Sequence, residues 1–318
     1  MRVIKSLEEL TPEYPAPVVT IGNFDGVHLG HQSLMRDLVV RAKEIGGTPI
    51  VLTFDPHPLQ LLAPNNAPLQ IQTLNQKLAV IESVRIPVAV VIPFDRQLAQ
   101  TSARDFAIQV LWERLHFKEI YVGPNFAFGN RRQGSFSLLK EIGEEKGFVT
   151  GKIRQVQFRG SRVSSTVIRQ ALISGQVGLV RRLLDRPFAL EGKVVPGAGL
   201  GRKLQVPTAN LETPNELVPR NGVYVTVLTL KGRRYRSVTN IGFRPTVSEK
   251  ENAKLSIEAH VLDFDRDIYG EDVLLKFMIR LRPERRFADL KALMKQMQID
   301  ISNTRRFFRW MEKINYFL

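Results

Sequence analysis

Two hydrophobic patterns follow one another along this chain, and they constrain its fold more than any other feature. In the first half, short runs of β-branched residues alternate with stretches whose apolar residues recur at helical spacing. The runs predict strands at Val18–Ile21, Ile50–Phe54, Val88–Ile92 and Ile120–Val122, with helices at 34–45, 74–83 and 106–115. Alternating strands and helices favour an α/β domain whose parallel sheet is covered by helices on both faces.

The second half has strand patterns in direct succession. They predict strands at Val223–Leu230, Arg234–Asn240, Leu255–Leu262 and Val273–Leu281. Polar and apolar residues alternate from Ser256 to Val261, as they do on a half-buried strand. We therefore expect a mainly antiparallel β-barrel. A long helix should follow it, and its apolar stripe from Leu290 to Phe308 is expected to serve packing.

The length of the chain and its change of pattern predict two domains. A chain of 318 residues exceeds what one compact core usually holds. The pattern changes near residues 184–187, so we expect an N-terminal domain at 1–184 and a C-terminal domain at 185–318. In a parallel sheet, ligands bind at the carboxyl ends of the strands, and site residues should directly follow strands.

Composition excludes several classes of protein. The chain has no cysteine, which rules out disulfides and thiolate metal sites, and no apolar run is long enough to span a bilayer. A secretory signal is not apparent, and a cytoplasmic enzyme without a membrane partner is expected. The net charge of +15 is spread over both halves. It favours phosphate-binding arginines on a solvated surface over a nucleic-acid partner.

The segment from Gly22 to His31 is the first that points to chemistry. It follows a predicted strand and opens a predicted helix, whose free N–H groups attract phosphate. His28 and His31 are three residues apart and can point the same way. They could then donate hydrogen bonds to a phosphoryl group that gains charge in its transition state. Two ordinary surface histidines and a metal site are the alternatives, although no third metal ligand is evident nearby.

Here a resemblance becomes specific. His28-Leu29-Gly30-His31 resembles the HxGH signature of the nucleotidyltransferase superfamily, and the whole segment is similar to that of bacterial bifunctional riboflavin kinase/FMN adenylyltransferases. The resemblance implies a Rossmann-like N-terminal domain in which His28 and His31 are catalytic. It also implies that ATP is bound by the loop residues Gly22, Asn23, Phe24 and Gly30.

A second motif of that family stands at 164–169. Hydroxyl groups at a helix start can cap the helix or bind phosphate oxygens, and an arginine one turn later can reach the same phosphates. A simple helix cap would explain the motif equally well when it is taken alone. The resemblance implies that Ser165, Thr166 and Arg169 hold the β- and γ-phosphates of ATP.

Two further strand ends resemble flavin-binding segments of the family. His57 lies in Phe54-Asp55-Pro56-His57-Pro58, which could also be only a proline-stiffened turn. Asn125 lies in the segment from Gly123 to Gly129, where Pro124 replaces an expected acidic residue. The resemblance implies that His57 and Asn125 bind flavin.

The C-terminal half has a glycine-rich stretch at 192–202, which lacks the spacing of a Walker A loop. Thr208 and Asn210 follow it, and residues two apart on an extended segment face the same side. Their neutral oxygens are weak Mg²⁺ ligands that need ATP phosphates and water to complete an octahedron. These features resemble a riboflavin kinase module with its Pro-Thr-Ala-Asn motif, although Gln205-Val206 departs from the family's Gly-Phe.

The kinase resemblance assigns roles to residues of this half. It implies that Thr208 and Asn210 hold Mg²⁺, and that Glu258 is the general base for the ribityl 5′-hydroxyl. A solvent-facing strand carboxylate is the alternative for Glu258. Binding of ATP is assigned to Gly197, Gly201 and Arg202.

Resemblance covers nearly the whole chain and implies two ATP-dependent steps that convert riboflavin to FMN and FMN to FAD. The implied partners are riboflavin, FMN and ATP, with Mg²⁺ as cofactor; a homo-oligomer is left open. Two rival classes remain at this point. One is a nucleotidyltransferase of other specificity whose barrel only binds flavin as a regulator. The other is a basic nucleic-acid-binding protein, whose binding would depend steeply on salt.

Overall fold

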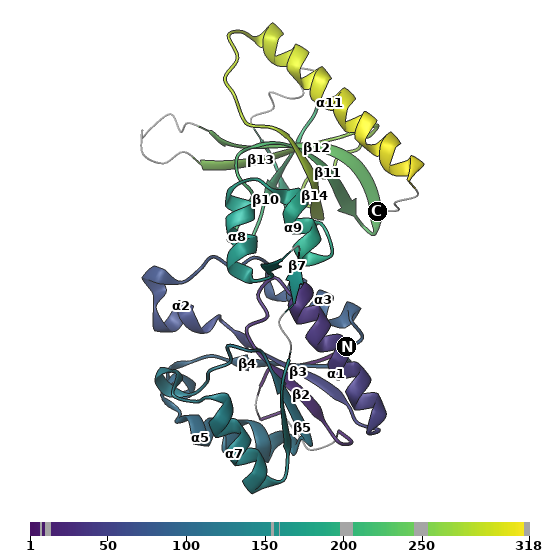
Figure 1. The fold of residues 1–318 in the computed structure, drawn as a ribbon. Coiled ribbons are helices and arrows are strands. Elements are labelled where there is room, and N and C mark those ends of the chain that lie inside the picture. The colour runs from purple at the N-terminus through teal and green to yellow at the C-terminus, as the bar shows by residue number, and fades with distance from the viewer. Residues whose placement is uncertain are drawn as a thin grey trace. The chain divides into compact units, whose positions relative to one another are not determined.

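A computed structural model describes residues 1–6, 8–9, 14–153, 156–158, 160–197, 206–244 and 254–314 of the chain. It forms two compact units, Met1–Ser165 and Thr166–Leu318, which are described separately (Figure 1). No helix in these ranges has the length and apolar character that crossing a bilayer requires.

The first unit is built on a six-stranded sheet in which every neighbouring pair is parallel. Its strands, in spatial order, are β1 (Arg2–Ile4), β4 (Val88–Pro93), β3 (Pro49–Asp55), β2 (Val18–Ile21), β5 (Glu119–Val122) and β6 (Val149–Lys152). The chain proceeds from β2 to one side of the sheet and then crosses to β5 on the other side. The loops after β2 and β5 therefore flank the point where ligands bind in such sheets.

Helices cover both faces of this sheet, because its strands are apolar on both sides (Figure 1). Val18 and Val51 face a core that includes Leu34 and Met35 of α1 (Leu29–Glu44). Their neighbours along the strands, such as Ile50, face the opposite core. The remaining helical segments of this unit are α2 (Pro58–Leu62), η1 (Pro64–Asn66), α3 (Leu74–Ser83), α4 (Arg96–Gln100), α5 (Ala103–Asp105), η2 (Phe106–Trp112), α6 (Glu113–Leu115), η3 (Asn130–Arg132) and α7 (Phe136–Lys146). A short hairpin, β7 (Gln157–Phe158) and β8 (Ser161–Arg162), precedes the end of the unit.

The second unit is a closed antiparallel barrel with helices outside it. Helix α8 (Ser165–Ile173) begins at the last residue of the first unit, and α9 (Val177–Leu184) follows. The barrel strands, in spatial order, are β10 (Ala209–Glu212), β13 (Lys254–Val261), β12 (Arg233–Arg244), β11 (Gly222–Leu230), β14 (Asp272–Arg282) and β9 (Phe188–Val195). The predicted fold class, a parallel α/β domain followed by an antiparallel barrel and a long terminal helix, is confirmed.

The terminal helix α11 (Leu290–Lys313) lies against the outside of the barrel (Figure 1). The Asp289 carboxylate caps its first turn by accepting a hydrogen bond from the backbone N–H of Ala292 at 2.7 Å. Near its other end, Phe308 and Met311 are buried against Val225 and neighbouring barrel residues. This part of the helix serves packing, as its apolar stripe predicts.

Candidate active sites

The loop between β2 and α1 has an unusual backbone. Phe24 and Val27 adopt positive φ angles of 47° and 34°, although neither is glycine, and Gly26 lies between them at 80°. Such angles are unfavourable for residues with a side chain and persist only where the surroundings enforce them. Phe24 and Val27 are both buried in the core beside α1, which holds the loop in this shape.

The loop delivers two histidines to the first turn of α1. His28 is the N-cap residue, and its Nδ1 accepts a hydrogen bond from the backbone N–H of His31 at 3.4 Å. The two rings are stacked with centroids 3.6 Å apart, and the edge of Phe24 packs on His31 at 5.2 Å. A Cβ at Gly30 would approach the His28 ring to 3.2 Å, so glycine leaves room for this stack. Both rings therefore lie at the positive end of a helix.

The charge state of His31 follows from its surroundings. Burial, reinforced by the nearby charges of His28 and Lys77, lowers the pKa of His31 well below its usual range. Its Nδ1 is buried without a hydrogen-bond partner in the described part of the chain. His31 is thus neutral at neutral pH.

Asn23 and His57 lie together at the carboxyl ends of β2 and β3. Asn23 Nδ2 is 3.0 Å from His57 Nε2, and the Asn23 carbonyl accepts a hydrogen bond from Thr53 Oγ1 at 3.2 Å. The second ring nitrogen of His57 accepts the backbone N–H of Leu59 at 3.2 Å, which makes His57 the N-cap of α2. The structure therefore brings a residue predicted to bind ATP into contact with one predicted to bind flavin.

The remaining predicted residues of this site lie at two places. The Ser165 hydroxyl donates to the backbone carbonyl of Asp25 at 2.8 Å, so it contacts the histidine loop. Thr166 and Arg169 follow on α8 in the second unit. Asn125 lies in the loop after β5. When its side-chain amide is turned so that the oxygen faces Arg162, this oxygen lies 3.1 Å from Arg162 Nη1 and can accept a hydrogen bond from it. Sequence reasoning did not single out Arg162, because a lone arginine in a short hairpin carries no local signal.

In the barrel, Glu258 occupies the centre of a polar row. It pairs with Asn210 on β10 and with Asn240 on β12, so the three residues share one face of the sheet. The Ser256 hydroxyl donates to Glu258 Oε1 at 2.9 Å. Asn240 was not among the predicted site residues, although its place opposite Glu258 follows from strand register.

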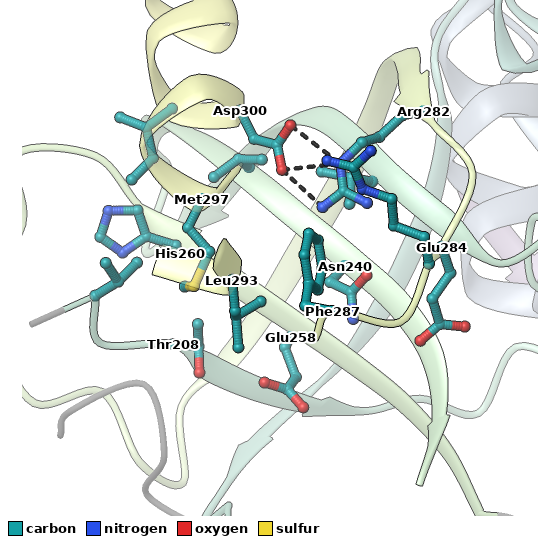
Figure 2. A pocket seen from close by; sticks show the side chains of 15 residues that line it. Thr208, Asn240, Glu258, His260, Arg282, Glu284, Phe287, Leu293, Met297 and Asp300 are labelled. Atoms are coloured by element: carbon teal, nitrogen blue, oxygen red, sulfur yellow. Dashed lines mark hydrogen bonds and ion pairs between the residues drawn. The ribbon is translucent and has the colours of Figure 1, made fainter. Parts of the chain in front are cut away.

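Glu258 lines a pocket of about 290 Å³ that lies between the barrel and the start of α11 (Figure 2). Thr208, Asn240 and His260 line it from the barrel side. Its apolar lining comes from both sides: valines line it on the barrel side, and outside the barrel it is lined by Phe287, Leu293, Met297 and Ile301. Part of the α11 stripe thus lines a pocket, contrary to the expectation that the stripe serves packing throughout.

A buried ion pair fixes α11 to the rim of this pocket. Arg282 at the end of β14 donates to both oxygens of Asp300 at 2.8 to 3.2 Å, as Figure 2 shows. Asp300 is 4% exposed and also accepts from Gln296 at 2.9 Å. The Arg282 guanidinium lies 5.6 Å from the ring of Phe287, and both residues line the pocket.

A second pocket of about 380 Å³ lies next to the first. Its lining includes Pro207, Phe264, Arg266 and Tyr269. The Arg266 guanidinium lies 5.0 Å from the centre of the Phe264 ring. Together the two groups form a flat surface that is both cationic and aromatic. Thr208 lines both pockets, and so marks the place where they meet.

The glycine-rich stretch is described up to Gly197. A Cβ at this position would lie 1.9 Å from Asn210 Nδ2, so any side chain here would displace that amide. Gly201 and Arg202, which were predicted to bind ATP, lie outside the described residues, as does Gln205. Within the described ranges, no group of three or more histidines and carboxylates could hold a metal ion by itself.

Comparison with known proteins matches each unit to a different enzyme family. Residues 11–167 match the family model described as FAD synthetase, and residues 184–308 match the one described as riboflavin kinase. The two matches follow one another along the chain without overlap.

Full-length relatives carry the same pair of modules. Bifunctional riboflavin kinase/FMN adenylyltransferases from Pseudomonas fluorescens and Escherichia coli K12 are each 37% identical to this chain, over 96% and 97% of it and over 97% and 98% of their own lengths. A solved structure described as a macrolide-efflux protein from Streptococcus pneumoniae is 27% identical, with a TM-score of 0.85 over 96% of this chain and 98% of that one. The chain therefore belongs to the family of bifunctional riboflavin kinase/FMN adenylyltransferases.

Proposed function

We propose that this chain makes FAD from riboflavin at two separate sites. The barrel transfers the γ-phosphoryl group of ATP to riboflavin and yields FMN and ADP. The N-terminal α/β unit then transfers the adenylyl group of a second ATP to FMN and yields FAD and pyrophosphate. Membership of the family supports both activities. One observation carries the location of the kinase site: Thr208 lies where two pockets of suitable chemistry meet.

In the kinase site, the flavin ring would lie in the pocket between the barrel and α11. The wall there is apolar and includes Phe287, which suits a flat aromatic ring. The adenosine of ATP would lie in the second pocket, against Arg266 and Phe264. This places the γ-phosphate beside Thr208 and within reach of Glu258, and Glu258 removes the proton of the attacking 5′-hydroxyl.

Mg²⁺ is proposed as the cofactor of the kinase reaction. Thr208 and Asn210 offer neutral oxygens on an extended segment, which fits an ion that takes most of its ligands from phosphates and water. Bound there, Mg²⁺ would neutralise charge on the transferred phosphoryl group. Gly197 supports this role, because its missing side chain makes space for the Asn210 amide.

In the adenylyltransferase site, an FMN phosphate oxygen attacks the α-phosphorus of ATP while the bond to pyrophosphate breaks. Catalysis depends on positioning and charge stabilisation without a covalent intermediate. His28 and His31 would donate hydrogen bonds to the crowded phosphoryl group at the helix start. The other roles are assigned by resemblance: the loop residues Gly22, Asn23, Phe24 and Gly30 bind ATP, Ser165, Thr166 and Arg169 hold pyrophosphate, and His57 and Asn125 contact flavin.

The wider assignments are proposals of the same kind. We place the adenylyltransferase domain at 1–184 and the kinase domain at 185–318, with helices α8 and α9 assigned to the first domain although they belong to the second compact unit. The matched ranges of 11–167 and 184–308 leave these two helices largely between them. We propose that the protein is a cytoplasmic enzyme. Its partners are the substrates riboflavin, FMN and ATP, and neither a nucleic acid nor a membrane is among them.

Incubating the purified protein with riboflavin, ATP and Mg²⁺, with products separated over time, tests the proposal. We expect FMN first and FAD later. Glu258→Ala should stop FMN formation while added FMN is still converted to FAD, and His28→Ala should do the reverse. If either substitution abolished both reactions equally in a folded protein, the two-site assignment would be wrong. A barrel that only regulates would consume no ATP with riboflavin.

A further inference from the structure

A buried lysine lies beneath the adenylyltransferase loop, and neither the motifs nor the proposed mechanism uses it. Lys77 on α3 is 6% exposed. Its Nζ lies 3.4 Å from Thr53 Oγ1, and this is the hydrogen bond that its ammonium group makes. Burial lowers the pKa of Lys77, while the carboxylates of Asp25 and Asp55 act in the opposite direction. A buried ammonium group is costly unless it is paired and fully hydrogen-bonded, so stabilisation of the fold alone does not account for Lys77.

The contacts of Lys77 lead directly into the site. Thr53 is fully buried and links Lys77 to the histidine loop, because its hydroxyl donates a hydrogen bond to the carbonyl of Asn23 at 3.2 Å. The Asn23 side chain then lies 3.0 Å from His57. A chain of polar contacts thus runs from α3 through β3 to two residues at the carboxyl edge of the sheet.

A second connection runs through charge. Lys77 is close enough to His31 to oppose a proton on its ring, and so is the stacked His28. The third neighbour, Phe24, is not ionisable. His28 from the helix cap and Lys77 from α3 are thus the charged groups that, together with burial, lower the pKa of His31. Asp25 and Asp55 act on Lys77 itself.

We propose that Lys77 is a positioning residue for adenylyl transfer: its ammonium group anchors the histidine loop from beneath and acts on the reaction through His31. A neutral His31 donates a single hydrogen bond to the phosphoryl group and leaves no repulsion within the stacked pair. The inference rests on the proposed assignment of adenylyl transfer to this loop. It adds a buried residue to which the proposed mechanism assigns no contact with substrate.

The test replaces Lys77 with methionine, which has a similar length and no charge. A loop displaced by about 1 Å is expected to slow FMN adenylylation about 100-fold. Riboflavin phosphorylation by the same protein should stay within about twofold and serves as an internal control for folding. Lys140→Met is the matched control, because this lysine is 64% exposed on α7, and it should change neither rate.

A readout beyond activity separates positioning from simple structural support. NMR titration of ring-labelled histidines, with His31 assigned by its own substitution, should show His31 titrating at higher pH in Lys77→Met than in the native protein. Lys77→Arg should restore the low titration, because it restores the charge. If the rate falls while the His31 titration does not move, Lys77 is only a structural support and the proposal is overturned.

Two further outcomes keep the inference separate from the site assignment. Should Lys77→Met not fold, Lys77→Gln keeps a donor for Thr53 without the charge, and an unmoved His31 titration in this variant would refute the proposal. His28→Ala is assayed in parallel. If it removes FMN adenylylation while Lys77→Met leaves it intact, only the inference fails; if both retain full activity, the site assignment fails as well.

Discussion

Substitution of Gly197 by alanine gives the sharpest test of the kinase site. The added Cβ would lie 1.9 Å from Nδ2 and 2.5 Å from Cγ of Asn210, whereas real Cβ contacts lie beyond 3.0 Å. The Asn210 amide must therefore move by about 1.1 Å, the difference between 3.0 and 1.9 Å. A displacement of about 1 Å in a positioning group costs about 100-fold in rate, or about 2.7 kcal/mol of transition-state stabilisation.

The assay follows riboflavin phosphorylation and FMN adenylylation separately in the same preparation. Gly197→Ala should slow the first reaction about 100-fold and leave the second unchanged. Gly178→Ala is the matched control, because a Cβ there meets nothing within 4 Å on α9. This control should keep both activities.

A double substitution tests whether the effect passes through Asn210. If the alanine acts by displacing this amide, then Asn210→Ala and the combined Gly197→Ala/Asn210→Ala variant should be equally slow, since the two changes remove the same interaction. Losses that multiply would refute the reasoning. So would a Gly197→Ala enzyme that phosphorylates riboflavin at the native rate.

Three other perturbations have definite expected outcomes. Asp300→Ala leaves Arg282 without its carboxylate partner. The free energy of unfolding, measured with urea, should fall by about 3 kcal/mol, which is the lower end for a broken buried pair because Arg282 is 18% exposed. An unchanged urea midpoint would contradict this. Phe287→Ala should raise the KM for riboflavin about tenfold and leave that for ATP unchanged in steady-state assays. Hydrogen bonds from Arg41 lower the pKa of Glu119, so this pair stabilises the fold at pH above the unfolded pKa of about 4.3, and the gain is lost as the pH falls through the lower folded pKa. Glu119→Gln should therefore lower the melting temperature at pH 7. In acid, the melting temperatures of the variant and of the native protein should lie closer together.

Much of the first unit could be predicted from the sequence because its strands and helices have strong periodic patterns. The predicted strand at 18–21 matches β2 and the predicted helix at 74–83 matches α3. The three-residue strand β1 was not predicted, since it is too short to show a period. The predicted helix at 106–115 exists but begins as the wider turn η2, and side-chain pattern does not report hydrogen-bond register.

In the barrel, the strands that close the structure were the ones that sequence reasoning missed. Glycine interrupts β9 at Gly192, where a Cβ would lie 2.1 Å from the carbonyl oxygen of Glu212 on β10. Close packing of β9 and β10 thus requires a glycine, and this glycine interrupts the sequence pattern by which β9 could have been predicted. β10 has only four residues, and none of them is fully buried.

The candidate sites divide in a similar way. Motif residues such as His28 and Thr208 could be named from sequence, because their types and spacing are local. The apolar wall of the proposed flavin pocket could not, because residues such as Met297 have the same helical period as packing residues. Only the three-dimensional arrangement distinguishes a stripe that faces a core from one that faces a pocket.

Closure of the barrel gives the two halves different exposure to intermolecular strand pairing. Each of the six barrel strands that the structure describes has a neighbour on both sides, so none of them is an edge strand that another chain could extend along its whole length. The parallel sheet ends at β1 and β6, each with one neighbour. β6 is the longer of the two, and Val149 at its start is 57% exposed. Aggregation through added strands would therefore begin at β6, where Lys152 supplies the charge that limits it.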